Sequence, residues 1–151
     1  MKKDAKMIAQ LKELRKIEKQ NGGVLHPKAV VMFARNPNTA LHSAFDWDDT
    51  TAAQQWRMEQ ARRLIRVMVE IVPHKGKNIR VSAFVALRSE RYHEAGYRYM
   101  PTLMTNEKGR QAVLQTALWE LMAFQDKYRD LSELAEVFKA IEKALRKTGK
   151  K

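Results

Sequence analysis

The sequence predicts a mainly helical α+β fold, in which a helix-turn-helix-like core of three helices is followed by a β-hairpin and two C-terminal helices. Apolar residues recur every three or four positions through most of the chain, a spacing typical of amphipathic helices. Between residues 69 and 87 they alternate with polar or smaller residues instead, which favours strands. At 151 residues the chain is long enough to bury one core without metals or disulfides, and it contains no cysteine.

Residues 1–21 are predicted to form a basic N-terminal helix. Four aliphatic residues spaced three apart make one apolar stripe on a segment otherwise rich in Lys, Arg and Glu. The stripe consists of Ile8, Leu11, Leu14 and Ile17. Asn21-Gly22-Gly23 ends the helix, because glycine adopts the left-handed conformation found at helix C-termini and two adjacent glycines form a flexible joint. We therefore expect an arm rather than part of the core.

Residues 22–105 are predicted to contain the core and a linker. The first core helix begins at Pro27, since proline suits the first helical position, and it ends before Asn36-Pro37. A short helical turn over residues 39–45 leads to a longer helix over residues 51–68. Two helices joined by so short a connection, with a third helix after them, are typical of a helix-turn-helix unit.

The helix over residues 51–68 has two different faces. Asp48, Asp49 or Thr50 can cap its free amides, and the carboxylates suit the positive end of the helix dipole. One face is apolar and is expected to be buried: Ala52, Ala53, Trp56, Ala61, Leu64, Ile65 and Met68. The opposite face carries glutamines and arginines, so it is available for polar or anionic partners.

After residue 68 the pattern predicts a β-hairpin. The residues from Pro73 to Asn78 favour a turn between two alternating segments, and this turn is basic. A linker over residues 88–105 is rich in Arg and Tyr. Its tyrosines, Tyr92, Tyr97 and Tyr99, could stack on single-stranded bases or fold onto the core.

Residues 106–151 are predicted to form a C-terminal pair of helices, over residues 107–127 and 131–147. Asp130 and Glu133 resemble a capping box at the start of the second helix. The apolar residues expected to face inward are Val113, Leu114, Ala117, Leu118, Leu121, Met122, Leu134, Val137, Phe138, Ile141 and Leu145. Trp119, Phe124 and Tyr128 widen the apolar surface, so a homodimer is a reasonable expectation.

The charge of the chain predicts a polyanionic partner. Lys and Arg number 29 against 17 Asp and Glu, which gives a formal charge of +12 and a pI near 10.1. With a winged-helix-like order of elements, double-stranded DNA is the expected ligand. The residues expected to face bases are Thr51, Gln54, Gln55 and Met58, and those expected to meet phosphates are Arg57, Arg62, Arg63, Arg66, Lys75, Lys77 and Arg80.

Other interpretations of these residues stay open. The basic face could be a solvated surface of a plain αβ domain, or it could dock on an acidic protein. Asp46-x-Asp48-x-Thr50 matches the nucleophile motif of haloacid dehalogenase-like phosphatases, but it lacks the buried strand and parallel sheet that this chemistry needs. The four histidines do not have the spacing of metal ligands, so we expect no metal site. We also expect no enzymatic activity and no cofactor.

One resemblance to known proteins can be named from the sequence. It is carried by Gly22–Pro27, by Leu41-His42-Ser43-Ala44-Phe45-Asp46-Trp47-Asp48-Asp49, and by Ala52-Ala53, Arg57 and Gln60–Ile65. Over about residues 22–87, and more loosely in the C-terminal helices, the chain resembles a family of short uncharacterised proteins of tailed phages and prophages. The resemblance implies the cytoplasm of a bacterial host but brings no established activity and no catalytic residues.

The sequence also predicts a protein without a membrane segment. Lys12, Glu13, Arg15 and Lys16 interrupt any apolar stretch that could follow the basic N-terminus, so a signal peptide is not expected. No run approaches the roughly 18 apolar residues that a spanning helix needs.

Overall fold

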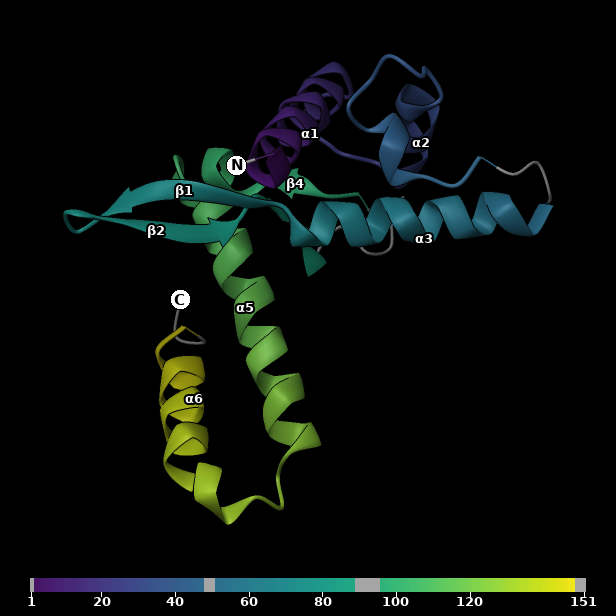
Figure 1. Ribbon diagram of the computed structural model, residues 1–151. Helices are drawn as coiled ribbons and strands as arrows, with labels where there is room; N and C mark the ends of the chain where they lie inside the picture. The colour runs from purple at the N-terminus through teal and green to yellow at the C-terminus, as the bar shows by residue number, and fades with distance from the viewer. Residues whose placement is uncertain (1, 48–50, 89–95, 149–151) are drawn as a thin grey trace.

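The computed structural model describes residues 2–47, 51–88 and 96–148, and it confirms a mainly helical α+β fold with a winged-helix-like layout (Figure 1). Three helices come first and are followed by an antiparallel hairpin, a smaller antiparallel strand pair and the C-terminal helices. The helices are α1 (Lys2–Gln20), α2 (Pro27–Ala34), α3 (Thr51–Val67), α4 (Met100–Leu103), α5 (Glu107–Lys127) and α6 (Ala135–Thr148), with 3-10 turns η1 at His42–Ala44 and η3 at Ser132–Leu134. The strands are β1 (Val69–His74), β2 (Lys77–Ser82), β3 (Phe84–Val85) and β4 (Arg98–Tyr99).

Helix α1 is part of the core, and the expectation of a separate arm was wrong. Leu14 and Ile17 are buried in the same cluster as residues of α2 and α3. The Glu13 carboxylate accepts hydrogen bonds from the backbone N–H groups of Ala40 and Leu41, each at 2.9 Å. The apolar stripe therefore packs over its C-terminal half, whereas Ile8, nearer the N-terminus, is 68 % exposed.

The connection between α2 and α3 is organised by Leu41 and Trp47. Leu41 is fully buried at the start of the 3-10 turn. The Trp47 indole stacks on the His42 ring at 5.0 Å and donates a hydrogen bond to the His42 carbonyl at 3.0 Å. These contacts hold the short turn predicted over residues 39–45. The capping residues expected at 48–50 lie outside the described residues.

Helix α3 packs on α2 through a narrower face than the sequence suggested. Ala61 and Ile65 are fully buried, but Trp56 is 44 % exposed, so its predicted burial was wrong. A helix turns about 100° per residue, so nine residues separate Trp56 from Ile65 by roughly half a circle. The two side chains therefore point to opposite sides of α3, and a single apolar face cannot include both.

The β1–β2 hairpin closes with a two-residue turn. Lys75 and Gly76 both have positive φ, 49° and 77°, as the tight turns that match strand twist require. The register pairs Val69 with Ser82 and His74 with Lys77. Alternation predicted pairing as far as residue 87, but the hairpin ends at Ser82.

The segment predicted as a linker instead contributes strand β4. Beyond buried Ala83, Phe84–Val85 pairs antiparallel with Arg98–Tyr99, and Leu25 forms a bridge with Tyr97. Tyr99 is buried, so this ring folds onto the core rather than standing free for stacking on bases. Tyr92 lies outside the described residues.

Tyr99 joins three parts of the core. Its ring packs edge-on to Phe84 at 5.7 Å, and the Arg15 guanidinium of α1 lies 4.0 Å from the ring centre. Its hydroxyl donates a 2.6 Å hydrogen bond to Oε2 of Glu70 in β1. Burial of the hydroxyl, and next its hydrogen bond to the Glu70 carboxylate, raise the pKa of Tyr99 from 10.0 to about 12.

The C-terminal helices form a pair that projects away from α1 and α2 (Figure 1). Helix α5 has the predicted bounds, and Asn106 caps it by accepting a hydrogen bond from the Gly109 N–H at 2.8 Å. Helix α6 begins at Ala135, later than predicted, because η3 replaces its first turn. That turn has no side-chain cap, so the predicted capping box is absent from this described segment.

We predict that replacing Tyr99 by Phe has a pH-dependent effect on stability. The unfolded chain ionises tyrosine near pH 10 and the folded chain near pH 12, so the neutral hydroxyl stabilises the fold fully below pH 10 and loses this effect as the pH rises to 12. At neutral pH, Tyr99→Phe should lower the free energy of unfolding by about 1 to 3 kcal/mol. Across pH 10 to 12 the parent should lose about 2 to 3 kcal/mol relative to the variant in urea titrations. A difference between the two proteins that stays flat over this range would contradict the geometry of the hydroxyl.

Candidate nucleic-acid interface

One row of predicted contact residues lies along α3. Residues 55, 58, 62 and 66 are spaced by three or four positions, so they share one side of the helix. The side chain of Thr51, which was predicted to face bases, lies outside the described part of the structure. Gln55 and Arg66 are exposed, whereas Met58 and Arg62 are partly covered. The structure thus places four of the eight α3 candidates on one side of the helix.

The arginines on this face are held by local contacts. Arg62 forms an ion pair with Glu59, and both side chains remain more than 40 % exposed. The Nε of Arg66 donates to the Arg62 carbonyl at 3.2 Å. On an adjoining row, the Arg63 guanidinium lies 5.1 Å from the centre of the exposed Trp56 ring. Contacts between exposed side chains add little to the free energy of unfolding. These contacts orient the guanidinium groups but leave them accessible to solvent.

Arg57 does not belong to this face, and its predicted contact with phosphate was wrong. Only 3 % of the residue is exposed. One guanidinium nitrogen donates to the Asp46 carbonyl at 3.2 Å, and the group lies 5.6 Å from the Trp47 ring centre. Arg57 precedes the buried Ala61 by four residues, which places both on the inward side of α3. Its role in the fold is to tie α3 to the preceding turn.

Gln54 also lies apart from Gln55, because it lines a groove between α2 and α3. Two adjoining hollows of about 350 and 420 Å³ share Lys28, Met32 and Met58. The first also involves Val31, Arg35, Gln54 and Arg57, and the second His26, Pro27, Ala29 and Arg62. We call this the α2–α3 groove. No acidic residue lines it in the described part of the chain.

Lys28 and Arg35 were not among the contact residues predicted from the sequence. They stand seven positions apart with Met32 between them, so the helical period could have placed all three on one face. The spacing is visible in the sequence, but neither cation was among the predicted contact residues. Met32 is 65 % exposed, although it belongs to a short helix with a buried side.

The cations of the hairpin are exposed but lie away from the α3 row. Lys75 and Lys77 are at the tip, and Arg80 pairs with Ile71 across the ladder. Figure 1 shows α3 and the hairpin extending to opposite sides of their junction near Met68. At the usual rise per residue, the two elements together span roughly 40 Å. The predicted residues therefore form a long stripe rather than a compact patch.

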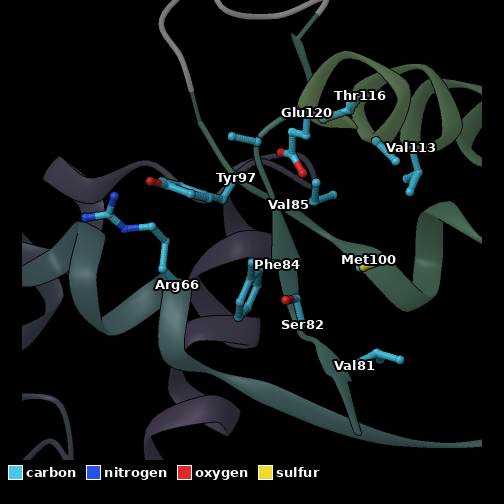
Figure 2. Close-up of a pocket in the computed structure, with 12 residues that line it drawn as sticks. Arg66, Val81, Ser82, Phe84, Val85, Tyr97, Met100, Val113, Thr116 and Glu120 are labelled. Carbon is cyan, nitrogen blue, oxygen red and sulfur yellow. The ribbon is translucent and has the colours of Figure 1, made fainter. Parts of the chain in front are cut away.

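Another hollow lies between the strands and α5. It measures about 610 Å³ and is lined mainly by residues of β2, β3 and α5, with Glu120 and Arg66 on its walls (Figure 2). Thr116 Oγ1 in its lining accepts a hydrogen bond from the Arg88 N–H at 3.2 Å and donates to the Ala112 carbonyl at 3.0 Å. The Arg88 guanidinium lies 3.7 Å from the Trp119 ring centre. This region connects the C-terminal pair to the core.

Comparison of the chain with protein-family models, with curated proteins and with solved structures finds no match. Within residues 2–47, 51–88 and 96–148, no three His, Asp or Glu residues are grouped as metal ligands would be. In the same part of the chain, no helix has the length and hydrophobicity needed to cross a bilayer.

We predict that Arg57 stabilises the fold, whereas its exposed neighbour Arg63 does not. Arg57→Ala removes a buried guanidinium and leaves the Asp46 carbonyl without that donor, so it should cost roughly 1 to 3 kcal/mol of unfolding free energy. Arg63→Ala, the matched control on the outer face, should change it by no more than about 0.5 kcal/mol. Urea unfolding followed by circular dichroism measures both, and equal stability of the two variants would show that Arg57 is not held as described.

Proposed function

We propose that this protein binds double-stranded DNA without catalysing a reaction, as a regulator or accessory DNA-organising factor. The observation that carries the proposal is the open face of α3, where Gln55, Arg62 and Arg66 share one row. A helix that presents an amide and several guanidinium groups on one side has the chemistry needed to enter a major groove. The formal charge of +12 supports the same class of partner.

The side chains of α3 divide into two kinds of contact. Gln55 can donate to and accept from an adenine edge, and the partly covered Met58 offers an apolar surface to a thymine methyl group. Arg62, Arg63 and Arg66 supply charge to phosphates, which gives affinity without sequence information. Gln54 faces the α2–α3 groove, so its contact with a base would need DNA to reach that groove.

Residues outside α3 extend the proposed contact with the DNA backbone. Lys28 of α2 and Arg35, which directly follows this helix, border the α2–α3 groove, and Lys75, Lys77 and Arg80 lie on the hairpin. A stripe of roughly 40 Å corresponds to about 12 base pairs at 3.4 Å each. Duplexes shorter than this would lose contacts at one end of the stripe.

The resemblance to tailed-phage and prophage proteins supports a role in a bacterial host cytoplasm. A homodimer fits this proposal, because two copies related by a two-fold axis would present two α3 helices to two half-sites. The Asp46-x-Asp48-x-Thr50 motif stays the basis of a less favoured alternative, a metal-dependent phosphatase or nuclease. Residues 48–50 lie outside the described residues.

A second candidate function is docking on an acidic protein. The α2–α3 groove favours it, since Met32 and Met58 are flanked by Lys28, Arg35 and Arg62. Methionine is flexible and suits adaptable protein contacts, and the cations would attract carboxylates. In this case the arginines of α3 would serve a protein surface and not a duplex.

We predict that Arg62→Ala and Arg66→Ala each weaken binding to all duplexes about equally. Loss of one phosphate contact should reduce the slope of log affinity against log salt by about one. Fluorescence anisotropy with a short labelled duplex, titrated at several salt concentrations, measures this slope. Arg129→Ala is the matched control, because Arg129 is an exposed, ion-paired arginine outside the proposed face. The absence of duplex binding by the parent protein at low salt would remove the proposal.

We predict that Gln55→Ala acts differently from the arginine variants. It should leave the salt slope and non-specific binding unchanged but cost about 1 to 3 kcal/mol at a preferred site found by selection from random duplexes. Gln54→Ala is the comparison variant on the groove side of the same helix. If all these variants bind like the parent while Arg62→Ala and Arg66→Ala lose an acidic protein partner in a pull-down, docking on a protein is the better explanation.

A further inference from the structure

The α5–α6 pair exposes large apolar side chains. Leu114, Leu121 and Phe124 of α5, Leu131 of the connection and Val137 of α6 each leave more than a third of their surface in water. Trp119 is also exposed, but its ring is covered on one side by Arg88 of the core, so it belongs to the junction. Leu114, Leu121 and Phe124 follow one another by seven and three positions, so they share one side of α5. Exposed apolar residues that share a face mark an interaction surface.

These side chains remain exposed because two helices cannot cover each other fully. Helix α6 contacts α5 through Phe138, whose ring lies 6.5 Å from Phe124, and through Glu142, which accepts a 3.4 Å hydrogen bond from Gln125. Among the residues of α6, all of which the structure describes, only Ile141 is buried. The remaining apolar side chains of both helices therefore stay in water unless another surface covers them.

Charge indicates which partner fits this surface. Residues 107–148 contain eight basic and seven acidic residues, whereas most of the excess positive charge lies in residues 1–106. A nearly neutral surface does not attract DNA, an acidic protein or an anionic membrane, and it does not repel its own copy.

The distribution of charge along α6 favours an antiparallel partner helix. Glu133 and Glu136 lie at or just before its start, whereas Lys143, Arg146 and Lys147 lie near its end. Within the helix Glu136 pairs with Lys139 and Arg146 with Glu142, but these side chains stay at least half exposed and can also meet a second copy. In a two-fold arrangement the acidic end of one copy meets the basic end of the other. The surface is therefore complementary to itself.

The size of the pair is adequate for such an interface. Helix α6 is about 21 Å long, and two adjacent helices are about 20 Å wide. With interdigitated side chains on both copies, the buried area is on the order of 1,000 Å², which a specific interface requires.

We infer that α5 and α6 form a homodimer interface, in which the pairs of two copies pack against each other as four helices with their α6 helices antiparallel. The inference depends on the proposed function only for what the dimer would do. If the protein binds DNA, a dimer would double the number of phosphate contacts on one duplex. The residues that support the inference lie in α5, in α6 and in the connection between them. Helices α5 and α6 project away from α1 and α2 (Figure 1).

The test is sedimentation equilibrium of the full chain at micromolar concentration without DNA. The parent should sediment as a dimer, and Val137→Lys should weaken dimerisation at least tenfold, because it places a charge on a side chain that is 46 % exposed in one copy. Ile8→Lys, a change at an exposed aliphatic residue of α1, is the matched control and should remain dimeric. A monomeric parent, or a Val137→Lys variant that dimerises like the parent, would overturn the inference.

If circular dichroism shows that Val137→Lys has lost helicity, a charge exchange provides a second measurement. Glu136→Lys and Lys143→Glu should each weaken the dimer, and the double variant should restore it. Failure of the double variant to restore the dimer would overturn the antiparallel arrangement. A dimer that does not bind DNA would remove only the proposed function, and a monomer that binds DNA would remove only this inference.

Discussion

The arrangement of the core depends on the contacts of Tyr99. Its ring lies between Phe84 and the Arg15 guanidinium, and its hydroxyl donates to Glu70, so a single side chain links α1, the hairpin and the β3–β4 pair. These elements are distant in sequence, and each of the two sheets has only two strands. Two-stranded ribbons are marginal in water and need such an anchor. The direction in which the hairpin leaves α3 therefore depends on β4.

This arrangement separates two surfaces of different chemistry. The α3 row and the hairpin carry exposed cations, whereas the α5–α6 pair is nearly neutral and exposes apolar side chains. Arg88 connects the α5–α6 pair to the core through its contacts with Thr116 and Trp119. The exposed apolar side chains of the pair come from residues outside α3. In the proposed function and the proposed dimer, the cations would contact DNA and the apolar side chains would contact a second copy of the chain.

The candidate interface was partly predictable from the sequence. The period of α3 places Gln55, Arg62 and Arg66 on one side whatever the tertiary structure, so that part of the prediction follows from helix geometry alone. Arg57 shows the limit, because composition counts it as a surface charge while the turn at Asp46 and Trp47 encloses it. Lys28 and Arg35 show the converse, since neither was predicted as a contact residue and both border the α2–α3 groove.

By itself the sequence determined the fold class, the bounds of α5, the hairpin and the excess of positive charge, since these depend on local periodicity, turn residues and composition. Only the tertiary structure decided that α1 joins the core, that Trp56 faces outward and that Arg98 and Tyr99 form a strand with Phe84 and Val85. These outcomes depend on contacts between segments far apart in the chain. Local patterns cannot reveal them, because a stripe or an alternation shows which side of an element is apolar but not which element covers it.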